Sequence, residues 1–502
     1  MEDSTRSPLV LLLALLSLVA AILLLLHHRH ARKMKMPPGP PALVFLAKFL
    51  ALRRSIFDLA PLLRDLHARH GPVISVRLFR TLVFVADRRL AHRALVQSGA
   101  TFADRPWLVE PGRLFTAGAR DISTSPYGPY WRLVRRNLAA EALHPARVGL
   151  YAPARRRARD AIVRDLLAAR GGDGSRAVEA RPVFRRALFE LLVYMSLGAR
   201  LGAEVLDEVQ KMQLQILRSI TSFPVFSFFP AVTKRLFPGR WEAYAAVRRR
   251  QDQIFLPLIR ARRTAEAAGP PCYADSLLAL RVADEGDRAL TDAELVSLCS
   301  EFLSGGTDST VTLLEWIMAE LVNHPDAQAK VYEEVRSKPE LNEGDLQEMP
   351  YLKAVVLEGL RLHPPGHFLL PHGVRSDADI GGYRVPRGAE VNFLVAEFGR
   401  DGAAWTAPLE FRPERFLDGG EGCDVDITGS REIKMMPFGA GRRMCPGHTL
   451  GLLHLEFFVG SLVRELEWLP PAEGEALDMT EVLDFTTVMK HPLRARIRPR
   501  IS

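Results

Sequence analysis

The sequence predicts a mainly α-helical protein with small β-sheets, preceded by one N-terminal transmembrane helix. Three observations support this fold class. Residues 9–26 are apolar apart from Ser17 and contain no charge. Residues 295–321 repeat apolar side chains with the period of a long helix. The alternation that is typical of strands occurs in residues 73–78 and 82–85, which we interpret as a β-hairpin.

The apolar N-terminal run is long enough to cross a bilayer. Its length at 1.5 Å per residue is about 27 Å, close to the hydrocarbon thickness of an endoplasmic reticulum membrane. A cleaved signal peptide is the alternative, but the run is longer than a usual h-region and no small-x-small site follows it. Acidic residues precede the run and basic residues follow it (Glu2 and Asp3; Arg29, Arg32, Lys33 and Lys35). The positive-inside rule therefore places the body of the protein in the cytosol.

A proline-rich segment, residues 37–41, follows the basic flank and predicts a stiff hinge. The predicted organisation is an anchor with its basic flank in residues 1–36, this hinge, and one domain in residues 42–502. The net charge of +9 favours a membrane surface or an acidic protein as partner. No regular basic-aromatic array is present, so we expect no nucleic-acid partner. The four cysteines form no CxxC pair, which argues against a disulfide scaffold.

Two segments in the first half of the chain allow two interpretations each. Trp131 and Arg135 are four residues apart and share a face of a predicted helix, as a surface pair or as part of a site. Residues 223–229 hold four phenylalanines around a proline, and form either core or a loop that dips into a membrane. The basic cluster in residues 155–159 is predicted to be a solvated helix face.

The middle of the helix over residues 295–321 is unusual. Gly305 and Gly306 each cost about 1 kcal/mol relative to alanine in a helix interior. A ligand pressed against the backbone would explain that cost, and a bend of the helix is the alternative. Asp308, Ser309 and Thr310 follow, and an acid beside hydroxyl groups can relay protons.

A charged pair lies in the next strongly apolar helical segment. Glu358 and Arg361 are three residues apart and face the same way. A buried pair needs further partners to offset its desolvation, and Arg415 is the candidate third member.

The last motif is residues 438–447, which read Phe-Gly-Ala-Gly-Arg-Arg-Met-Cys-Pro-Gly. A thiol at the start of a helix, such as that of Cys445, is a candidate nucleophile or metal ligand, although an inert buried cysteine is the alternative. Glycines allow close approach of something flat, and Arg442 and Arg443 can bind carboxylates. Haem with an axial cysteine fits all of these features.

The spacing of Phe438, Gly441, Arg443, Cys445 and Gly447 resembles the haem-binding signature of the cytochromes P-450. The anchor, the hinge, Trp-x-x-x-Arg, the glycine-containing helix and the charged triad occur in that family's order. The sequence as a whole is similar to those of plant microsomal A-type members of the family, and among them to the eighty-nine A group.

The resemblance implies the cytochrome P-450 fold and a set of functional residues. Haem b is expected on the thiolate of Cys445, within the loop that contains Phe438, Gly441 and Gly447. The expected propionate ligands are Arg443, Trp131, Arg135 and His372. Asp308, with Ser309 or Thr310, is expected to deliver protons, although Ser309 replaces the family's usual threonine. The resemblance further implies that the triad Glu358, Arg361 and Arg415 locks the core, that residues 223–229 touch the membrane, and that residues 485–488 touch substrate.

The implied activity is a monooxygenase that inserts one atom of O2 into a small apolar metabolite. Electrons are expected from NADPH through a separate reductase, since the chain has no Gly-x-Gly-x-x-Gly site. The implied location is the endoplasmic reticulum membrane, with a single span and a cytosolic catalytic domain. A haem-thiolate isomerase or dehydratase and a non-catalytic haem sensor are the alternatives.

Overall fold

The computed structural model describes residues 36–52, 60–77, 80–171, 176–222, 225–227, 229–263, 269–338 and 340–500. The predicted transmembrane helix, residues 9–26, lies outside these ranges. Among the residues described, no helix combines the length and the apolarity that a bilayer crossing needs. The proline-rich segment is described, and its backbone lies against strand β1, where the amide of Ser75 donates to the Pro38 carbonyl (2.8 Å).

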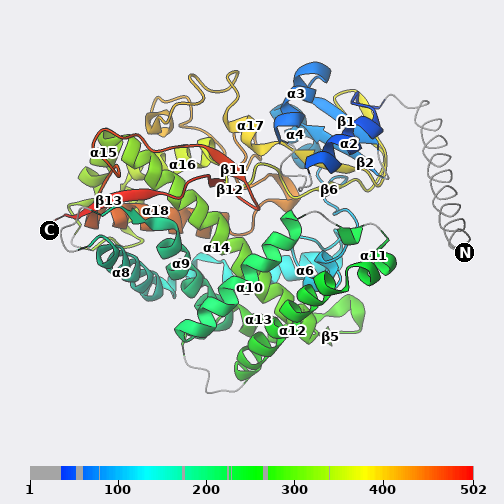
Figure 1. The fold of residues 1–502 in the computed structure, drawn as a ribbon, viewed down its shortest axis with the longest axis horizontal. Helices are drawn as coiled ribbons and strands as arrows, with labels where there is room; N and C mark the ends of the chain where they lie inside the picture. Colours follow the sequence, from blue (N-terminus) through cyan, green and yellow to red (C-terminus); the bar gives the residue numbers. More distant parts are fainter. Residues whose placement is uncertain are drawn as a thin grey trace, which may run out of the picture.

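Helices make up most of the described chain (Figure 1). The α-helices are α2 (Ala42–Leu52), α3 (Ala60–His70), α4 (Arg88–His92), α5 (Gly112–Phe115), α6 (Pro129–Asn137), α7 (Pro145–Gly149), α8 (Ala152–Ala169), α9 (Ala180–Leu197), α10 (Ala203–Thr221), α11 (Pro230–Leu236), α12 (Pro238–Ala261), α13 (Tyr273–Ala279), α14 (Asp292–Asn323), α15 (Pro325–Val335), α16 (Pro350–Leu362), α17 (Val395–Gly399) and α18 (His448–Glu465).

The strands form small sheets. They are β1 (Val73–Arg77), β2 (Thr81–Val85), β3 (Val178–Glu179), β4 (Arg281–Val282), β5 (Arg288–Ala289), β6 (His372–Gly373), β7 (Ala378–Ile380), β8 (Tyr383–Val385), β9 (Glu390–Phe393), β10 (Leu466–Leu469), β11 (Glu481–Leu483), β12 (Thr487–Met489) and β13 (Arg494–Pro499). The largest sheet in the described chain has the order β1-β2-β9-β6. The predicted hairpin is confirmed, with Val73 paired to Val85 and Arg77 to Thr81.

Helix α14 is the centre of the helical core and confirms the long helix that the sequence predicts. It contacts α9, α12, α16 and α18, and it runs through the middle of the helical region in Figure 1. Its start is set by a capping box, in which Thr291 and Glu294 each accept from the other's backbone amide. Nearly every residue of its second half is buried, so α14 is a fixed wall for whatever lies beside it.

One expectation for the first half of the chain, the solvated basic cluster, needs correction. For the other, the phenylalanine-rich segment, the structure shows a part of each alternative. The basic cluster is not simply solvated, because Arg155 is fully buried and its Nε donates to Glu343 (2.6 Å). Of the phenylalanine-rich segment, Phe223, Pro224 and Phe228 lie outside the described residues. Phe226 is buried, whereas Phe229 is exposed, so the segment contributes both to the core and to the surface.

Candidate active site

A cavity of about 430 Å³ lies between the middle of α14 and the loop that carries Cys445. The predicted site residues on its wall are Trp131, Arg135, Ser309, Thr310, His372, Phe438, Arg443, Cys445 and Gly447. They come from α6, α14, β6 and the cysteine loop. The fold therefore brings together residues that are more than three hundred positions apart, as in the hydrogen bond from Arg135 to the carbonyl of Met444.

The cysteine loop holds its thiol at the floor of the cavity just before α18 begins. The amide of Cys445 donates to the Phe438 carbonyl (2.7 Å), which closes the loop on itself. Burial raises the pKa of the Cys445 thiol, while the Gly447 amide and the charge of Arg135 act in the opposite direction. Among the cavity-lining residues Cys445 is the one thiol, since Cys272 and Cys299 are buried elsewhere and Cys423 is exposed.

The glycines of this loop have different roles, and one expectation needs correction. Gly447 lines the cavity, as does Gly439, so both leave room for a flat ligand. Gly441 does not line it. Gly441 has φ +70°, and a Cβ there would lie 1.9 Å from the carbonyl oxygen of Leu95. Gly441 therefore seats the loop against the backbone of Leu95, and Arg442 likewise points away, to the hydroxyl of Tyr127.

One wall of the cavity carries three guanidinium groups, from Arg105, Arg135 and Arg443. They bond to backbone carbonyls: Arg443 to Ala103, Ile122 and Ser125, Arg105 to Ser123, Leu370 and Pro371, and Arg135 to Met444. Among the described residues, none of the three forms an ion pair with a carboxylate. Burial, and then the charge of Arg105, lowers the pKa of Arg443 to about 9. The carboxylates of Asp104 and Asp121 act on this wall from nearby without forming an ion pair with it. Three guanidinium groups gathered on one wall are suited to an anionic ligand.

His372 lies at the same wall and is buried. Its Nδ1 is 2.6 Å from the Phe102 carbonyl, so Nδ1 carries a proton and donates. Burial, and then the charges of Arg105 and Arg443, lowers the pKa of His372 to about 3. The ring can offer a second N–H to an anion only as an imidazolium, and the negative charge of that anion would favour this form.

Trp131 does not point its N–H into the cavity. Its Nε1 donates to the carbonyl of Ile122 (3.0 Å), the same oxygen that accepts from Arg443. The guanidinium of Arg443 lies 4.4 Å from the Trp131 ring centroid. Trp131 thus holds Arg443 in place and lines the cavity with its ring.

The opposite wall is α14. Gly305 is exposed within the helix because it faces the cavity, which accounts for glycine at this position. The hydroxyl of Ser309 donates to the Gly305 carbonyl (2.9 Å), and that of Thr310 to the Gly306 carbonyl (2.8 Å). Both residues line the cavity, so each hydroxyl oxygen can also accept a hydrogen bond from a ligand in the cavity.

Asp308 takes a different direction from the two hydroxyl residues. It does not line the cavity, and its carboxylate pairs with Arg185 of α9. Burial raises the pKa of Asp308 although Arg185 opposes the shift. The structure therefore separates the three predicted proton-delivery residues into two on the wall and one behind it.

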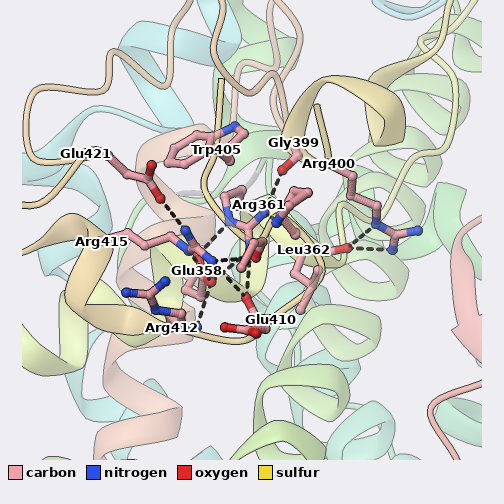
Figure 2. Close-up of polar contacts among 12 residues, drawn as sticks. Glu358, Arg361, Leu362, Gly399, Arg400, Trp405, Glu410, Arg412, Arg415 and Glu421 are labelled. Carbon is pink, nitrogen blue, oxygen red and sulfur yellow. Dashed lines mark hydrogen bonds and ion pairs between the residues drawn. The ribbon is translucent and has the colours of Figure 1, made fainter. Parts of the chain in front are cut away.

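The charged triad is assembled in the buried core (Figure 2). Arg361 donates twice to Glu358, at 2.6 and 2.8 Å, and Arg415 donates to the same carboxylate at 3.2 Å. All three residues are almost completely buried. The remaining donors of Arg361 reach the carbonyls of Gly399, Pro408 and Glu410, so the triad pins the segment between α17 and η7 (Pro413–Phe416). Glu421 is a second carboxylate for Arg415 that sequence reasoning missed.

Two further cavity residues, Arg105 and Glu301, were also missed. Arg105 follows the buried pair Phe102 and Ala103 and precedes a proline, a context that gives no periodic signal. Glu301 lies one helical turn before Gly305, a spacing that places both on one face of α14. That spacing is the signal by which Glu301 could have been found.

Residues 37–497 match the family model of cytochrome P450. The chain belongs to the cytochrome P450 family. This P450 is 44% identical, over 93% of its length and 94% of the relative, to cytochrome P450 89A9 of Arabidopsis thaliana. It is 30% identical to a flavonoid 3'-monooxygenase of Arabidopsis thaliana, with 86% of each chain covered. A cyanobacterial P450, CYP120A1, solved with retinoic acid bound, has a TM-score of 0.74 at 20% identity over 93% of this chain and 100% of that one, a likeness that shows the fold alone.

Membership confirms the predicted family, a plant P450, and the mainly helical P450 fold. It also identifies the chain as a P450 monooxygenase with haem b on a cysteine thiolate and electrons from a reductase. The residues present fit this cofactor. The cavity has one thiol on its floor, a mid-helix glycine across from it, and three guanidinium groups without carboxylate partners to receive two propionates.

Proposed function

We propose that this P450 inserts one atom of O2 into a small, mostly apolar plant metabolite, with Cys445 as the axial ligand of haem b. The observation that carries the proposal is the convergence of Cys445, the unpaired guanidinium groups and Gly305 on one cavity. The flavonoid 3'-monooxygenase among the relatives supports a plant secondary metabolite as the substrate class. Most of the cavity lining is apolar, including Leu298, Phe302 and Phe485, which suits such a substrate.

Each group of site residues has a role in this proposal. Bound haem supplies an iron whose thiolate ligand favours cleavage of the O–O bond. Arg443 and Arg135 would hold the propionates, with Arg105 beside them, and His372 would join them where the propionate charge stabilises its imidazolium form. Trp131 orients Arg443. Ser309 and Thr310 hold a proton at their hydroxyl oxygens on the distal wall. Asp308 supplies protons from behind the helix when its ion pair with Arg185 opens. The loop with Phe438, Gly439 and Gly447 shapes the floor.

The triad of Glu358, Arg361 and Arg415 has a structural role in this proposal. It fixes the segment that precedes the cysteine loop, and so keeps the floor of the cavity in register with α14. Phe485 and Thr486, from the predicted substrate-contacting turn, line the cavity. Thr487 and Val488 of that turn belong to β12 and lie outside the lining.

We further propose a membrane location, with residues 1–36 as a single-span anchor in the endoplasmic reticulum, residues 37–41 as hinge and residues 42–502 as the cytosolic catalytic domain. Exposed apolar side chains on α2 and α11 support it: Leu43, Val44, Val232 and Leu236. Both helices lie toward the same side of the molecule (Figure 1), where they would meet a bilayer. An NADPH-dependent reductase is the proposed electron donor. The net positive charge of this chain would suit a reductase whose docking face is acidic.

The decisive experiment is an absorption spectrum of the haem-loaded protein, followed by an assay for oxygenated products. The reduced, carbon-monoxide-bound protein is expected to show the red-shifted Soret band of thiolate-ligated haem, and Cys445→His is expected to lose that band. With reductase, NADPH and a plant extract, the wild type is expected to yield oxygenated products. Turnover without NADPH would favour an isomerase or dehydratase, and haem binding without any turnover would favour a sensor.

A further inference from the structure

A buried histidine outside the cavity has no role in the function proposed above. His363 follows α16 directly and is 5% exposed, and its ring stacks on that of Trp316 with 4.3 Å between the centroids. Its two nitrogens face two carboxylates: Nε2 lies 2.7 Å from Glu320 of α14, and Nδ1 lies 3.6 Å from Glu481 of β11. The second distance is too long for a hydrogen bond but suits an ion pair. One imidazole therefore lies between charged side chains of two other elements.

The charges of these two carboxylates indicate the protonation of the ring. Burial raises the pKa of Glu320, but hydrogen bonds with His324 and His363 outweigh burial and lower it overall. Burial likewise raises the pKa of Glu481, but its contacts with His363 and Arg400 bring it down to about 2. Both groups are thus ionised at neutral pH, and Nε2 must carry a proton toward Glu320. In a neutral ring the lone pair of Nδ1 would then face the charge of Glu481 and be repelled, whereas an imidazolium is attracted by both carboxylates.

The contacts of His363 lead to the turn that lines the active-site cavity. Glu481 is the first residue of β11, which pairs with β12, and the turn between the two strands reaches the cavity through Phe485. Trp316, on which His363 stacks, donates its Nε1 to the Thr487 carbonyl of β12 (2.8 Å). His363 therefore supports both strands of this hairpin, one through an ion pair and the other through the ring of Trp316.

We propose that His363 is a positioning residue that, as an imidazolium, binds Glu320 and Glu481 at the same time and so holds the substrate-contacting turn against α14. The inference rests on the proposed function, since it concerns residues that would contact the substrate of that cavity. Loss of the proton as the pH rises leaves two carboxylates facing a ring that can serve only one of them, and the hairpin loosens. Substrate binding is then coupled to pH at a group that does not touch the substrate.

A second cavity of about 720 Å³ borders this cluster, so protons from solvent can reach the ring. Guanidinium groups keep their charge throughout the accessible pH range. His367 is neutral from pH 6 to pH 9, because burial, and then the charge of Arg64, lowers its pKa to about 4. His324 titrates in this range, since its hydrogen bond to Glu320 raises its pKa, and the experiment must separate it from His363. The charged or titratable side chains around the ring and along this cavity, besides the two carboxylates, are His324, His367, Arg64, Arg400, Glu410 and Arg412.

The test measures how firmly the hairpin is held. Amide hydrogen exchange of residues 481–489 is followed in the haem-loaded, full-length protein from pH 6 to pH 9, and expressed as protection factors so that the intrinsic pH dependence of exchange cancels. In the wild type, protection is expected to fall about tenfold over this range, the equivalent of one hydrogen bond. His363→Gln keeps one donor for Glu320, and its protection is expected to be low at pH 6 and unchanged at pH 9.

Three further variants assign the response. Glu481→Gln removes the charge that Nδ1 faces, is expected to abolish the pH dependence, and carries the test if His363→Gln does not load haem. His324→Gln is expected to keep the wild-type response. His491→Gln is the matched control, because His491 Nε2 also lies 3.6 Å from a carboxylate, that of Asp478, beside the same hairpin but exposed. It too is expected to respond like the wild type.

Three results would overturn the inference. They are protection that does not change with pH in the wild type, the same tenfold fall in Glu481→Gln, and loss of the response in His324→Gln, which would assign it to that residue. Exchange does not require turnover, and the thiolate Soret band is recorded for every variant. A wild type with the band and no pH response signals failure of this inference alone, whereas a wild type without the band signals failure of the proposed function.

Discussion

The carboxylate of Asp308 pairs with the guanidinium of Arg185, a residue of α9, and not with the hydroxyls that follow it on α14. A pairing at the back of the helix places the acid between the protein's outer layer and the distal wall, since Arg185 is part-exposed. Proton delivery through Asp308 would then depend on how readily this pair opens.

Asp308→Asn tests this dependence. The variant keeps the size of the side chain and loses its charge, so we expect product formation to fall about 100-fold. Substrate binding and the thiolate Soret band are expected to remain, because Asp308 does not line the cavity. Full turnover of Asp308→Asn, measured as product per NADPH consumed, would contradict a role for this carboxyl.

Glu358→Ala is expected to abolish haem loading. The substitution leaves Arg361 and Arg415 buried without their shared carboxylate, which costs about 3–5 kcal/mol. The haem content per mole of purified protein measures the effect. Glu333→Ala is the matched control, because Glu333 and Arg336 form an ion pair with the same three-residue spacing at the surface. The control is expected to change stability by less than about 0.5 kcal/mol.

Gly441→Ala is expected to destabilise the protein by about 3 kcal/mol or more, because it combines a left-handed backbone with a clash. The added Cβ would lie 1.9 Å from the Leu95 carbonyl oxygen. Thermal unfolding measures the loss. Gly402→Ala meets nothing within 4 Å and is expected to leave the midpoint unchanged. Equal midpoints for the two variants would refute the tight packing of Gly441 against Leu95.

Stability at low pH is expected to depend on Glu294. Burial raises the pKa of Glu294, but hydrogen bonds from Arg288, the Thr291 amide and Arg120 outweigh burial and bring this pKa down to about 2. A carboxyl whose pKa is lower in the folded than in the unfolded protein contributes stability that is complete above about pH 4.5 and lost as the pH falls toward 2. We expect this loss to be about 2 kcal/mol larger in the wild type than in Glu294→Gln.

Unfolding midpoints measured between pH 6 and pH 2.5 check this expectation. Parallel pH profiles for the wild type and Glu294→Gln would show that the capping carboxyl of α14 contributes nothing to the acid response.

Most features that sequence reasoning predicted are set by local spacing, and the distant pairing of Arg415 with Glu358 is the exception. Glu358 and Arg361 are neighbours on any helix, and so are Trp131 and Arg135, which α6 carries on one face. Gly305 was identified because a glycine inside a helix needs an explanation, and the cavity supplies it.

The features that it missed depend on packing between distant segments. The partner of Asp308 is 123 residues earlier, and the partner of Arg155 is 188 residues later. A basic residue that pairs across such a distance has the same local pattern as one in solvent, and for this reason Arg155 was misassigned. Gly441 was predicted to allow close approach of another group, but the loop sequence does not reveal that this group is the backbone of Leu95.

The contact between Arg443 and the Ala103 carbonyl joins positions 340 residues apart. During synthesis the ribosome releases residue 103 long before residue 443 exists, so the cationic wall has no finished geometry until translation is nearly over. Capture of the cofactor must therefore be a late event that follows completion of the polypeptide. Chains that stop before the cysteine loop would lack both Arg443 and Cys445, could not bind the cofactor, and would be substrates for cellular quality control.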